Sequence, residues 1–293
     1  MSDEAVSAYI SRRRIGEAEI TLVSEGSCLW APRLSVPEPE WRRALPEADA
    51  QGRIPIGFAV AHIRLGDASV IVDPGFDDPG SAWQARFDAA FPSLAGLVRT
   101  PGLRAALAHI GVAPDRITHV LITHAHADHF AGVTAERDGR QHARFPRARH
   151  LVGRADWERN PKRAEPASDL AVRLAAIERL GLLDLLDGER EVAPGITAIP
   201  APGETPGHMI VRVRSGAASF YYLGDLFHHA CEVEHPDWAP PGRDGAALRA
   251  SRDALVADAT ASGALLVYSH GRFPGWGRIR RTAAGPRWEA APA

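Results

Sequence analysis

Apolar and polar residues alternate along several segments in the first half of the chain, as they do in strands with one buried face. Within residues 14–31, Ala18, Ile20 and Leu22 fall on the same face of an extended chain. Gly66-Asp67 separates two further strand-like segments and is typical of a hairpin turn. The pattern predicts strands in this half at residues 14–31, 57–65, 69–72, 117–122 and 149–152.

A helical spacing of apolar residues is clearest at residues 167–186, where Leu170, Leu174 and Ile177 recur every three or four positions. The same reasoning predicts helices at residues 40–45, 82–91, 103–110, 155–159 and 246–261. The later strands are expected at residues 196–199, 209–213, 220–223 and 264–268, with a short strand pair within residues 278–288.

The order of these segments, strands followed by helices and then strands again, favours an α/β fold. About half of the expected strands alternate and half are continuously apolar, which is typical of sheets packed on each other with helices outside. No linker divides the 293 residues, so we expect one domain over residues 1–293. Residues 32–55 are rich in proline and charge and predict either a flap over a site or a disordered insert.

Composition narrows the class of partner. A formal net charge of -2 gives no support to binding of nucleic acid or of an anionic membrane surface. No apolar run approaches the roughly 18 residues of a membrane span, and no secretory signal is visible at the N-terminus. We therefore expect a cytoplasmic protein that acts on a small molecule, without a nucleic-acid or membrane partner.

The strongest chemical signal is the octet Thr-His-Ala-His-Ala-Asp-His-Phe at residues 123–130, directly after an expected strand. It places His124, His126, Asp128 and His129 within six positions. Imidazole nitrogen and carboxylate oxygen both bind zinc and related divalent ions. A loop that follows a strand can hold such ligands on one point, so the octet predicts a metal site.

Three later residues lie at expected strand ends and would complete such a site. His208 ends the turn Gly-Glu-Thr-Pro-Gly-His, Asp225 follows an apolar strand and a glycine, and His270 follows the strand at 264–268. Taken singly these signals are weak, and an acidic residue such as Asp225 is more often part of a turn or a cap. Together they provide what a catalytic metal requires, which is ligands from several rigid elements that converge on one edge.

This succession of His-X-His-X-Asp-His, Gly-His, Gly-Asp and a late histidine resembles the metallo-β-lactamase superfamily of metallohydrolases. Residues 269–277 are similar to a stretch found in the branch of quorum-quenching lactonases and methyl parathion hydrolase-like enzymes. The resemblance spans residues 14–288 and implies an αββα sandwich with the site at one edge of the two sheets. It also implies two divalent metal ions. We expect these to be zinc, with manganese, cobalt and iron as the alternatives.

Carried over position by position, the resemblance implies a first ion bound by His124, His126 and His208, a second bound by Asp128, His129 and His270, and Asp225 as the bridge. Asp73, at the end of the strand at 69–72, matches a position common in the superfamily. We expect its carboxylate to orient the metal loop through hydrogen bonds, and the alternative is a simple turn residue.

The implied reaction is hydrolysis of lactones, N-acyl-homoserine lactones among them, or of related esters by a hydroxide that bridges two metals. Asp128 would also carry a proton to the leaving oxygen. His228 stands where the known acyl-homoserine lactonases have a tyrosine that contacts the lactone, and it can donate a similar hydrogen bond. We expect part of the flanking aromatic residues to line the substrate pocket, namely Phe76, Phe130, Phe227, Trp238, Phe273 and Trp276.

Two other functions remain open at this point. An organophosphate or aryl-ester hydrolase would use the same site, because the same hydroxide can attack a carbonyl carbon or a phosphorus atom. An iron-dependent oxidoreductase of the persulfide dioxygenase type would bind iron through similar ligands. The resemblance also suggests a homodimer, because relatives often form one.

Overall fold

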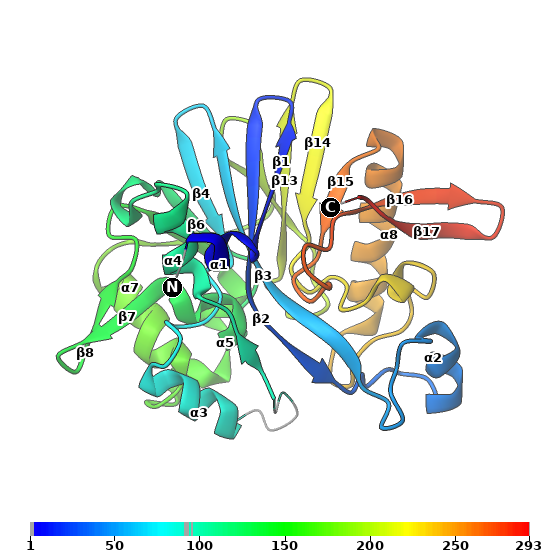
Figure 1. Cartoon of the computed structure of the whole chain (residues 1–293), viewed down its shortest axis with the longest axis horizontal. Coiled ribbons are helices and arrows are strands. Elements are labelled where there is room, and N and C mark those ends of the chain that lie inside the picture. Colours follow the sequence, from blue (N-terminus) through cyan, green and yellow to red (C-terminus); the bar gives the residue numbers. More distant parts are fainter. Residues whose placement is uncertain (1–2, 91–93, 95, 293) are drawn as a thin grey trace.

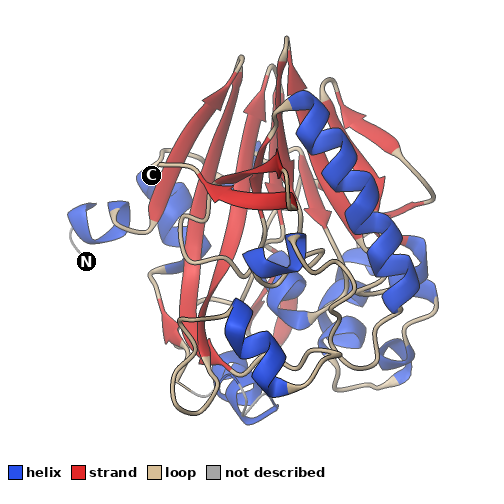
Figure 2. Cartoon of the chain, turned by 90° about the vertical axis from the view of Figure 1, so that its right-hand side faces the viewer, coloured by secondary structure: helices blue, strands red, loops and turns tan. Residues whose placement is uncertain are grey.

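Two β-sheets lie face to face, and helices cover the outer side of each sheet (Figures 1 and 2). The structure is a computed structural model and describes residues 3–90, 94 and 96–292. In Figure 1, α4 and α7 lie on one side of the paired sheets and α8 lies on the other. The expected αββα sandwich is therefore confirmed.

The first sheet has the order β1-β2-β3-β4-β6-β9-β10, with β5 paired to β2. Its strands β4, β6, β9 and β10 run parallel, so the C-terminal ends of β4 and β6 meet at one edge. The strands are β1 (Ile10–Ile15), β2 (Ala18–Trp30), β3 (Ile54–Leu65), β4 (Ala68–Val72), β5 (Val98–Arg99), β6 (His119–Ile122), β9 (Arg149–Gly153) and β10 (Leu183–Leu186).

The second sheet follows the chain from β11 to β17, and β7 and β8 form a separate hairpin. Its strands are β11 (Arg190–Ala193), β12 (Ile196–Pro200), β13 (Met209–Ser215), β14 (Ala218–Tyr222), β15 (Leu265–Val267), β16 (Gly277–Thr282) and β17 (Gly285–Ala290). The hairpin consists of β7 (Thr134–Arg137) and β8 (Arg140–Ala143).

The helices are short apart from α8, which Asp244 caps by accepting the backbone N–H of Ala247 at 3.0 Å. They are α1 (Asp3–Ser7), α2 (Glu38–Ala44), α3 (Ala82–Ala90), α4 (Gly102–His109), α5 (Ala127–Phe130), α6 (Arg154–Glu158), α7 (Ala175–Arg179) and α8 (Gly245–Ser262). None of the helices in the described part of the chain has both the length and the apolar character needed to cross a bilayer.

The alternation noted in the sequence determines the core between the sheets. Ala18, Ile20 and Leu22 of β2 are fully buried and pack with Val211 and Val213 of β13. The residues of β2 and β3 on the opposite face pack under α4. Burial of both faces of the first sheet holds the C-terminal ends of its strands in place, and the loops at those ends carry the candidate site.

Three sequence expectations need correction or comment. The helix expected at 167–186 is a π-helical segment (Leu170–Leu174) followed by α7, and it ends at Arg179, because Gly181 takes a left-handed backbone (φ 69°) just after the C-cap Leu180. The last four residues instead form β10, paired with β9. The disordered alternative for residues 32–55 is wrong, since α2 lies there with Trp41 buried. The helix expected at 82–91 is α3, and its last expected position lies outside the described residues.

Candidate metal centre

The His-rich loop after β6 is fixed by the carboxylate of Asp73, at the end of the neighbouring strand β4. Oδ1 of Asp73 accepts the backbone N–H of Thr123 at 2.7 Å, and Oδ2 accepts the Thr123 hydroxyl at 2.8 Å. The same Oδ2 lies 2.9 Å from Nδ1 of His129. This contact places the proton of His129 on Nδ1 and leaves Nε2 free to face the site.

A second carboxylate, Asp156 in the first turn of α6, connects two loops of the site. Its Oδ2 accepts the backbone N–H of Ala125 at 2.8 Å and the hydroxyl of Thr205 at 2.7 Å. Its Oδ1 accepts the backbone N–H of Gly207 at 2.7 Å. Sequence analysis missed Asp156, because acidic residues are common in the first turn of any helix.

Gly224 lets the loop after β14 approach the His-rich loop closely. Its backbone is left-handed (φ 53°), and a Cβ there would lie 2.7 Å from Oγ1 of Thr123 and 2.8 Å from Nε2 of His208. Any side chain at this position would therefore push apart the two loops that carry the predicted ligands. The glycine allows Asp225, the next residue, to reach the centre of the site.

His270 enters from the loop after β15 and is oriented by strand β3. Its Nδ1 lies 3.1 Å from the carbonyl oxygen of Gly57, so Nε2 faces the carboxylates. That Nε2 lies 3.3 Å from Oδ2 of Asp225 and 3.6 Å from Oδ2 of Asp128. The loop after β15 thus delivers its imidazole to the same place as the His-rich loop after β6 and the loop after β14.

The donor atoms gather in two groups, with Asp225 facing both. Nε2 of His124 lies 2.8 Å from Nδ1 of His126 and 3.6 Å from Oδ2 of Asp225. On the other side, Nε2 of His129 lies 3.4 Å from Oδ2 of Asp128 and 3.3 Å from Oδ1 of Asp225. Asp225 therefore lies where a bridging carboxylate would be needed.

His208 lies beside the first group rather than within it. Its Nδ1 lies 3.0 Å from the carbonyl oxygen of Ala201, and its Nε2 accepts the backbone N–H of Asp225 at 3.1 Å. Its ring centre is 5.2 Å from that of His124. The structure thus brings six of the seven predicted ligands into two close groups, and Glu204, which sequence analysis did not single out, joins the first group.

Several buried polar atoms of the site have no hydrogen-bond partner among the described residues. They are Nε2 of His129, Oδ1 of Asp225 and both carboxylate oxygens of Glu204. Buried polar atoms are rarely left unpaired, because their desolvation is costly. Imidazole nitrogen and carboxylate oxygen are also ligands that zinc and related divalent ions accept. The residues present therefore fit divalent metal ions.

The imidazoles of the first group, and that of His208 beside it, are held neutral. Burial lowers the pKa of His124, His126 and His208, and neighbouring imidazoles lower that of His124 further. A neutral imidazole offers a nitrogen lone pair, which a metal ligand requires.

The second group shows the opposite tendency. Burial lowers the pKa of His129, but the charges of Asp225 and Asp128 outweigh it and raise the pKa well above its usual value. Burial raises the pKa of Asp128, but His129 and His270 outweigh it and bring that pKa to about 2. The site therefore attracts positive charge, and metal binding would displace protons from it.

His228, the predicted substrate-contacting residue, lies next to both groups. Its Nε2 is 3.4 Å from Oδ2 of Asp225, and its ring stacks on that of His270 with centres 5.7 Å apart. Its backbone N–H reaches Oε2 of Glu232 at 3.3 Å. Burial lowers the pKa of His228, but Asp225, Glu204 and Glu232 outweigh it and raise that pKa to about 9.

A cavity of about 290 Å³ opens over the donor groups, and it is apolar on one part of its wall and charged on another. The apolar part consists of Trp30, Ile56, Phe58 and Leu94. The charged part includes Lys162, Glu204 and Arg243 besides the predicted ligands. Trp30, Ile56 and Phe58 could not be predicted from the sequence, because the register of β2 and β3 decides which side chains face the cavity, and the other lining residues reach it from segments that only the fold brings together.

The aromatic residues expected to line the pocket do not line this cavity in the described structure. They belong to the hydrophobic cores instead: Phe130, Phe227 and Trp276 are buried in three different clusters, Phe76 and Trp238 in a fourth, and Phe273 packs against the core between the sheets. Nearness to a ligand in sequence does not determine where a side chain points. Phe76 supports the cavity from behind, 4.8 Å from the ring of Phe58.

Residues 32–55 pack against the loop that follows Asp225. Oε1 of Glu47 lies 2.7 Å from Nε2 of His229, and the ring of Trp30, just before this segment, stacks on His228 at 5.9 Å. The segment therefore packs beside Trp30 and the loop that carries His228, two residues that line the cavity, while none of the described residues 32–55 lines it.

The sequence profile of the metallo-beta-lactamase superfamily matches residues 60–270, which include all of the predicted ligands. The chain belongs to the metallo-beta-lactamase superfamily. Curated relatives of the chain are named as hydrolases.

Two curated relatives illustrate the similarity in sequence. A probable metallo-hydrolase of Mycobacterium tuberculosis is 27% identical over 188 residues, which cover 57% of this chain and 56% of the relative. An N-acyl homoserine lactonase of Bacillus cereus is 20% identical over 160 residues, or 54% of this chain and 58% of the relative. The chain thus spans little more than half the length of the curated relatives it matches.

Solved structures match over nearly the whole chain. AidC, a dizinc quorum-quenching lactonase in complex with a homoserine product, has a TM-score of 0.74 at 21% identity, covering 97% of this chain and 98% of AidC. The hydrolase AbOPH has a TM-score of 0.77 at 19% identity, with the same coverage. At this level of identity the likeness shows the fold.

Proposed function

We propose that this protein is a single-domain hydrolase that uses two divalent metal ions to cleave lactones or related esters, with N-acyl-homoserine lactones as the first substrates to test. The observation that carries the proposal is the position of Asp225. Its carboxylate lies between the two donor groups, 3.6 Å from Nε2 of His124 on one side and 3.3 Å from Nε2 of both His129 and His270 on the other, which is the position a bridging ligand between two ions would need.

The donor groups suggest how two ions would be held. His124, His126 and Asp225 would bind the first ion, and Asp128, His129 and His270 the second; His208 remains a predicted ligand of the first. When bound, such ions polarise a carbonyl group and lower the pKa of water to near neutrality.

The remaining chemistry falls to side chains of this chain. His228 is buried beside both groups and carries an N–H on a ring whose Nε2 lies 3.4 Å from Asp225. His228 stands at the position of the lactonase tyrosine. Its N–H would donate a hydrogen bond to the substrate oxygen and orient the lactone ring for attack. Asp128 borders the same cavity and would carry a proton to the leaving oxygen.

The cavity favours a substrate with an apolar acyl or aromatic part. The apolar wall formed by Trp30, Ile56 and Phe58 lies in the same cavity as Asp128 and Asp225. A cavity of about 290 Å³ is near the lower end of the range for small-molecule sites. A lactone with a short acyl chain would therefore place its ring at the donor groups and its chain along the wall.

A substrate panel tests this proposal. The metal-loaded protein would be assayed with an N-acyl-homoserine lactone, an aliphatic lactone, an aryl ester and an aryl phosphotriester, alongside Asp225→Asn and Asp237→Asn. The second variant changes an exposed carboxylate on the surface and is the matched control. We expect lactone or ester turnover that Asp225→Asn abolishes and Asp237→Asn retains.

Two outcomes would contradict the proposal. Turnover of the triester alone would favour the organophosphate hydrolase. Iron in the purified protein, oxygen consumption with a persulfide substrate and no hydrolysis would favour the oxidoreductase.

A further inference from the structure

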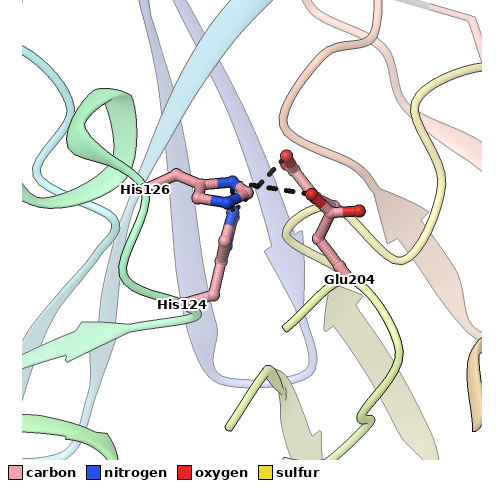
Figure 3. Close-up of side chains that lie close together, drawn as sticks. His124, His126 and Glu204 are labelled. Carbon is pink, nitrogen blue, oxygen red and sulfur yellow. Dashed lines mark hydrogen bonds and ion pairs between the residues drawn. The ribbon is translucent and has the colours of Figure 1, made fainter. Parts of the chain in front are cut away.

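Glu204 is a buried carboxylate in the cavity that the predicted ligand set does not account for. Its side chain is 0% exposed, and neither of its oxygens has a hydrogen-bond partner of good geometry among the described residues. Figure 3 shows its carboxylate directed toward the imidazoles of His124 and His126. A carboxylate in this position carries a large desolvation cost unless positive charge compensates it, and the guanidinium of Arg243, 2.6 Å from Oε1, supplies part of that charge.

Neighbouring donor atoms of the group that contains Glu204 are spaced about as closely as ligands around one ion. Oε1 of Glu204 lies 3.5 Å from Nδ1 of His126, which in turn lies 2.8 Å from Nε2 of His124. Oδ2 of Asp225 lies 3.6 Å from Nε2 of His124, and the donor atoms of all four residues lie within 4.8 Å of one another. Tetrahedral ligands about 2.1 Å from a zinc ion lie roughly 3.4 Å apart.

His208 is not one of the donors grouped around His124 and His126 in the structure. Its Nε2 accepts the backbone N–H of Asp225 at 3.1 Å, and it lies outside the group of four donors that Glu204 completes. Glu204 and His208 belong to the same turn, four residues apart, and this turn presents Glu204 to the first group and His208 beside it.

The turn holds Glu204 rigidly. On one side, Gly203 has φ 139° and lies against the backbone of Leu248, where a Cβ would come within 2.3 Å. On the other side, the Thr205 hydroxyl donates to Asp156 at 2.7 Å. Both neighbours of Glu204 are therefore fixed, and its carboxylate is positioned by the turn rather than by a flexible loop.

We infer that Glu204 supplies a carboxylate oxygen to the first metal ion, in addition to the ligands expected from the family. This inference rests on the metal site of the proposed function. Arg243, whose guanidinium lies 2.6 Å from Oε1 of Glu204, is the outer partner that holds the carboxylate in place. A carboxylate oxygen has two lone pairs, so it can accept from Arg243 and bind an ion at once.

The consequence concerns metal preference. A second carboxylate makes the first site richer in oxygen than three imidazoles would, and carboxylate oxygen suits manganese better than imidazole nitrogen does. We therefore expect the first site to bind manganese more tightly in the wild-type protein than in a variant without this carboxylate.

The test measures metal directly, so it does not depend on any substrate. The full chain would be loaded with cobalt and its visible spectrum recorded, and zinc and manganese affinities at each site would be obtained by chelator competition. Glu204→Gln and Glu204→Asp would be compared with Glu158→Gln, which changes an exposed carboxylate on α6. The melting temperature of each metal-free variant would show that it folds.

We expect Glu204→Gln to keep one site at wild-type affinity and to lose about tenfold or more at the other, with a changed cobalt spectrum. Glu204→Asp, with its shorter side chain, is expected to change the spectrum while it keeps part of the affinity, and Glu158→Gln to match the wild type. Two ions bound to Glu204→Gln at wild-type affinity with an unchanged spectrum would overturn the inference. Since no substrate is involved, a failure of the proposed lactone hydrolysis would appear separately, as inactivity of the wild-type protein with two ions bound.

Discussion

Oδ2 of Asp73 lies 2.9 Å from Nδ1 of His129, across the gap between the ends of β4 and β6. This contact links a side chain at the end of β4 to a predicted ligand on α5, 56 residues later in the chain. Because it fixes both the proton and the direction of the ring, it determines whether Nε2 of His129 can face Asp225.

Asp73→Asn is expected to weaken metal binding by about 10–100-fold, because the amide is a poorer acceptor for the N–H of His129. Asparagine tolerates the left-handed backbone at this position (φ 51°), so the turn itself should survive. Chelator competition with Asp73→Asn and with Asp67→Asn, at an exposed hairpin turn, measures the effect. Equal affinities in the two variants would show that Asp73 is only a turn residue.

Gly224→Ala is expected to destabilise the protein more than Gly216→Ala, although both glycines have left-handed backbones. At either position the backbone costs roughly 1–2 kcal/mol. At Gly224 the added Cβ would also meet Thr123 and His208 within 2.8 Å, whereas nothing lies within 4 Å at Gly216. Crowding of this kind costs about 1–3 kcal/mol more. Denaturant unfolding of both variants would settle the comparison, and equal losses would speak against the close approach.

Arg252→Met is expected to cost about 3–5 kcal/mol of stability, because it leaves the buried carboxylate of Glu232 without its partner. Arg252 is fully buried, forms an ion pair with Glu232 and donates to the carbonyl oxygen of Leu226 at 2.8 Å. It thereby holds the loop that carries His228. Arg249→Met, one turn earlier on α8, removes only exposed ion pairs and serves as the control with no measurable loss. Similar unfolding curves for the two variants would refute this role of Arg252.

His150 is expected to make the protein less stable in acid. Burial lowers the pKa of His150 from 6.5 to about 4, so between these values the unfolded chain binds more protons than the folded one. The free energy of unfolding therefore falls as the pH drops from 6.5 to 4, by about 1.4 kcal/mol per pH unit at most from this group.

In His150→Leu the slope of stability against pH should be shallower in this range by up to that amount, and His142→Leu, on the exposed β7–β8 hairpin, should keep the wild-type slope. Urea unfolding at a series of pH values from 4 to 7 gives both slopes. A slope in His150→Leu as steep as in the wild type would exclude His150 as the source.

The sequence predicted those features that depend on short stretches of chain. The octet at 123–130 carries four donors in one loop, and the apolar strands before Asp225 and His270 placed these two residues at strand ends. The sandwich followed from alternating and continuously apolar strand patterns, and Ile20 and Leu22, which share one face of β2, are buried between the sheets as that pattern predicts.

Features that depend on register or on distant contacts were not predictable in this way. Leu183–Leu186 is a short apolar run, which fits a helix as well as a buried strand, and only pairing with β9 decides for the strand. Phe76 and Trp276 turn into the cores because of packing that no local pattern encodes. Glu204 was visible as a charged residue in a Gly-Pro turn four residues before His208, but its burial came only with the fold.

The measurement that tests the central claim most directly is a metal titration of the chelator-treated protein, with hydrolysis of an N-acyl-homoserine lactone followed at each step. The account predicts that activity rises with added zinc and reaches its plateau at about two ions per chain, and that Asp225→Asn stays inactive at every metal loading. Full activity without metal, or no hydrolysis of any lactone or ester when two ions are bound, would contradict it.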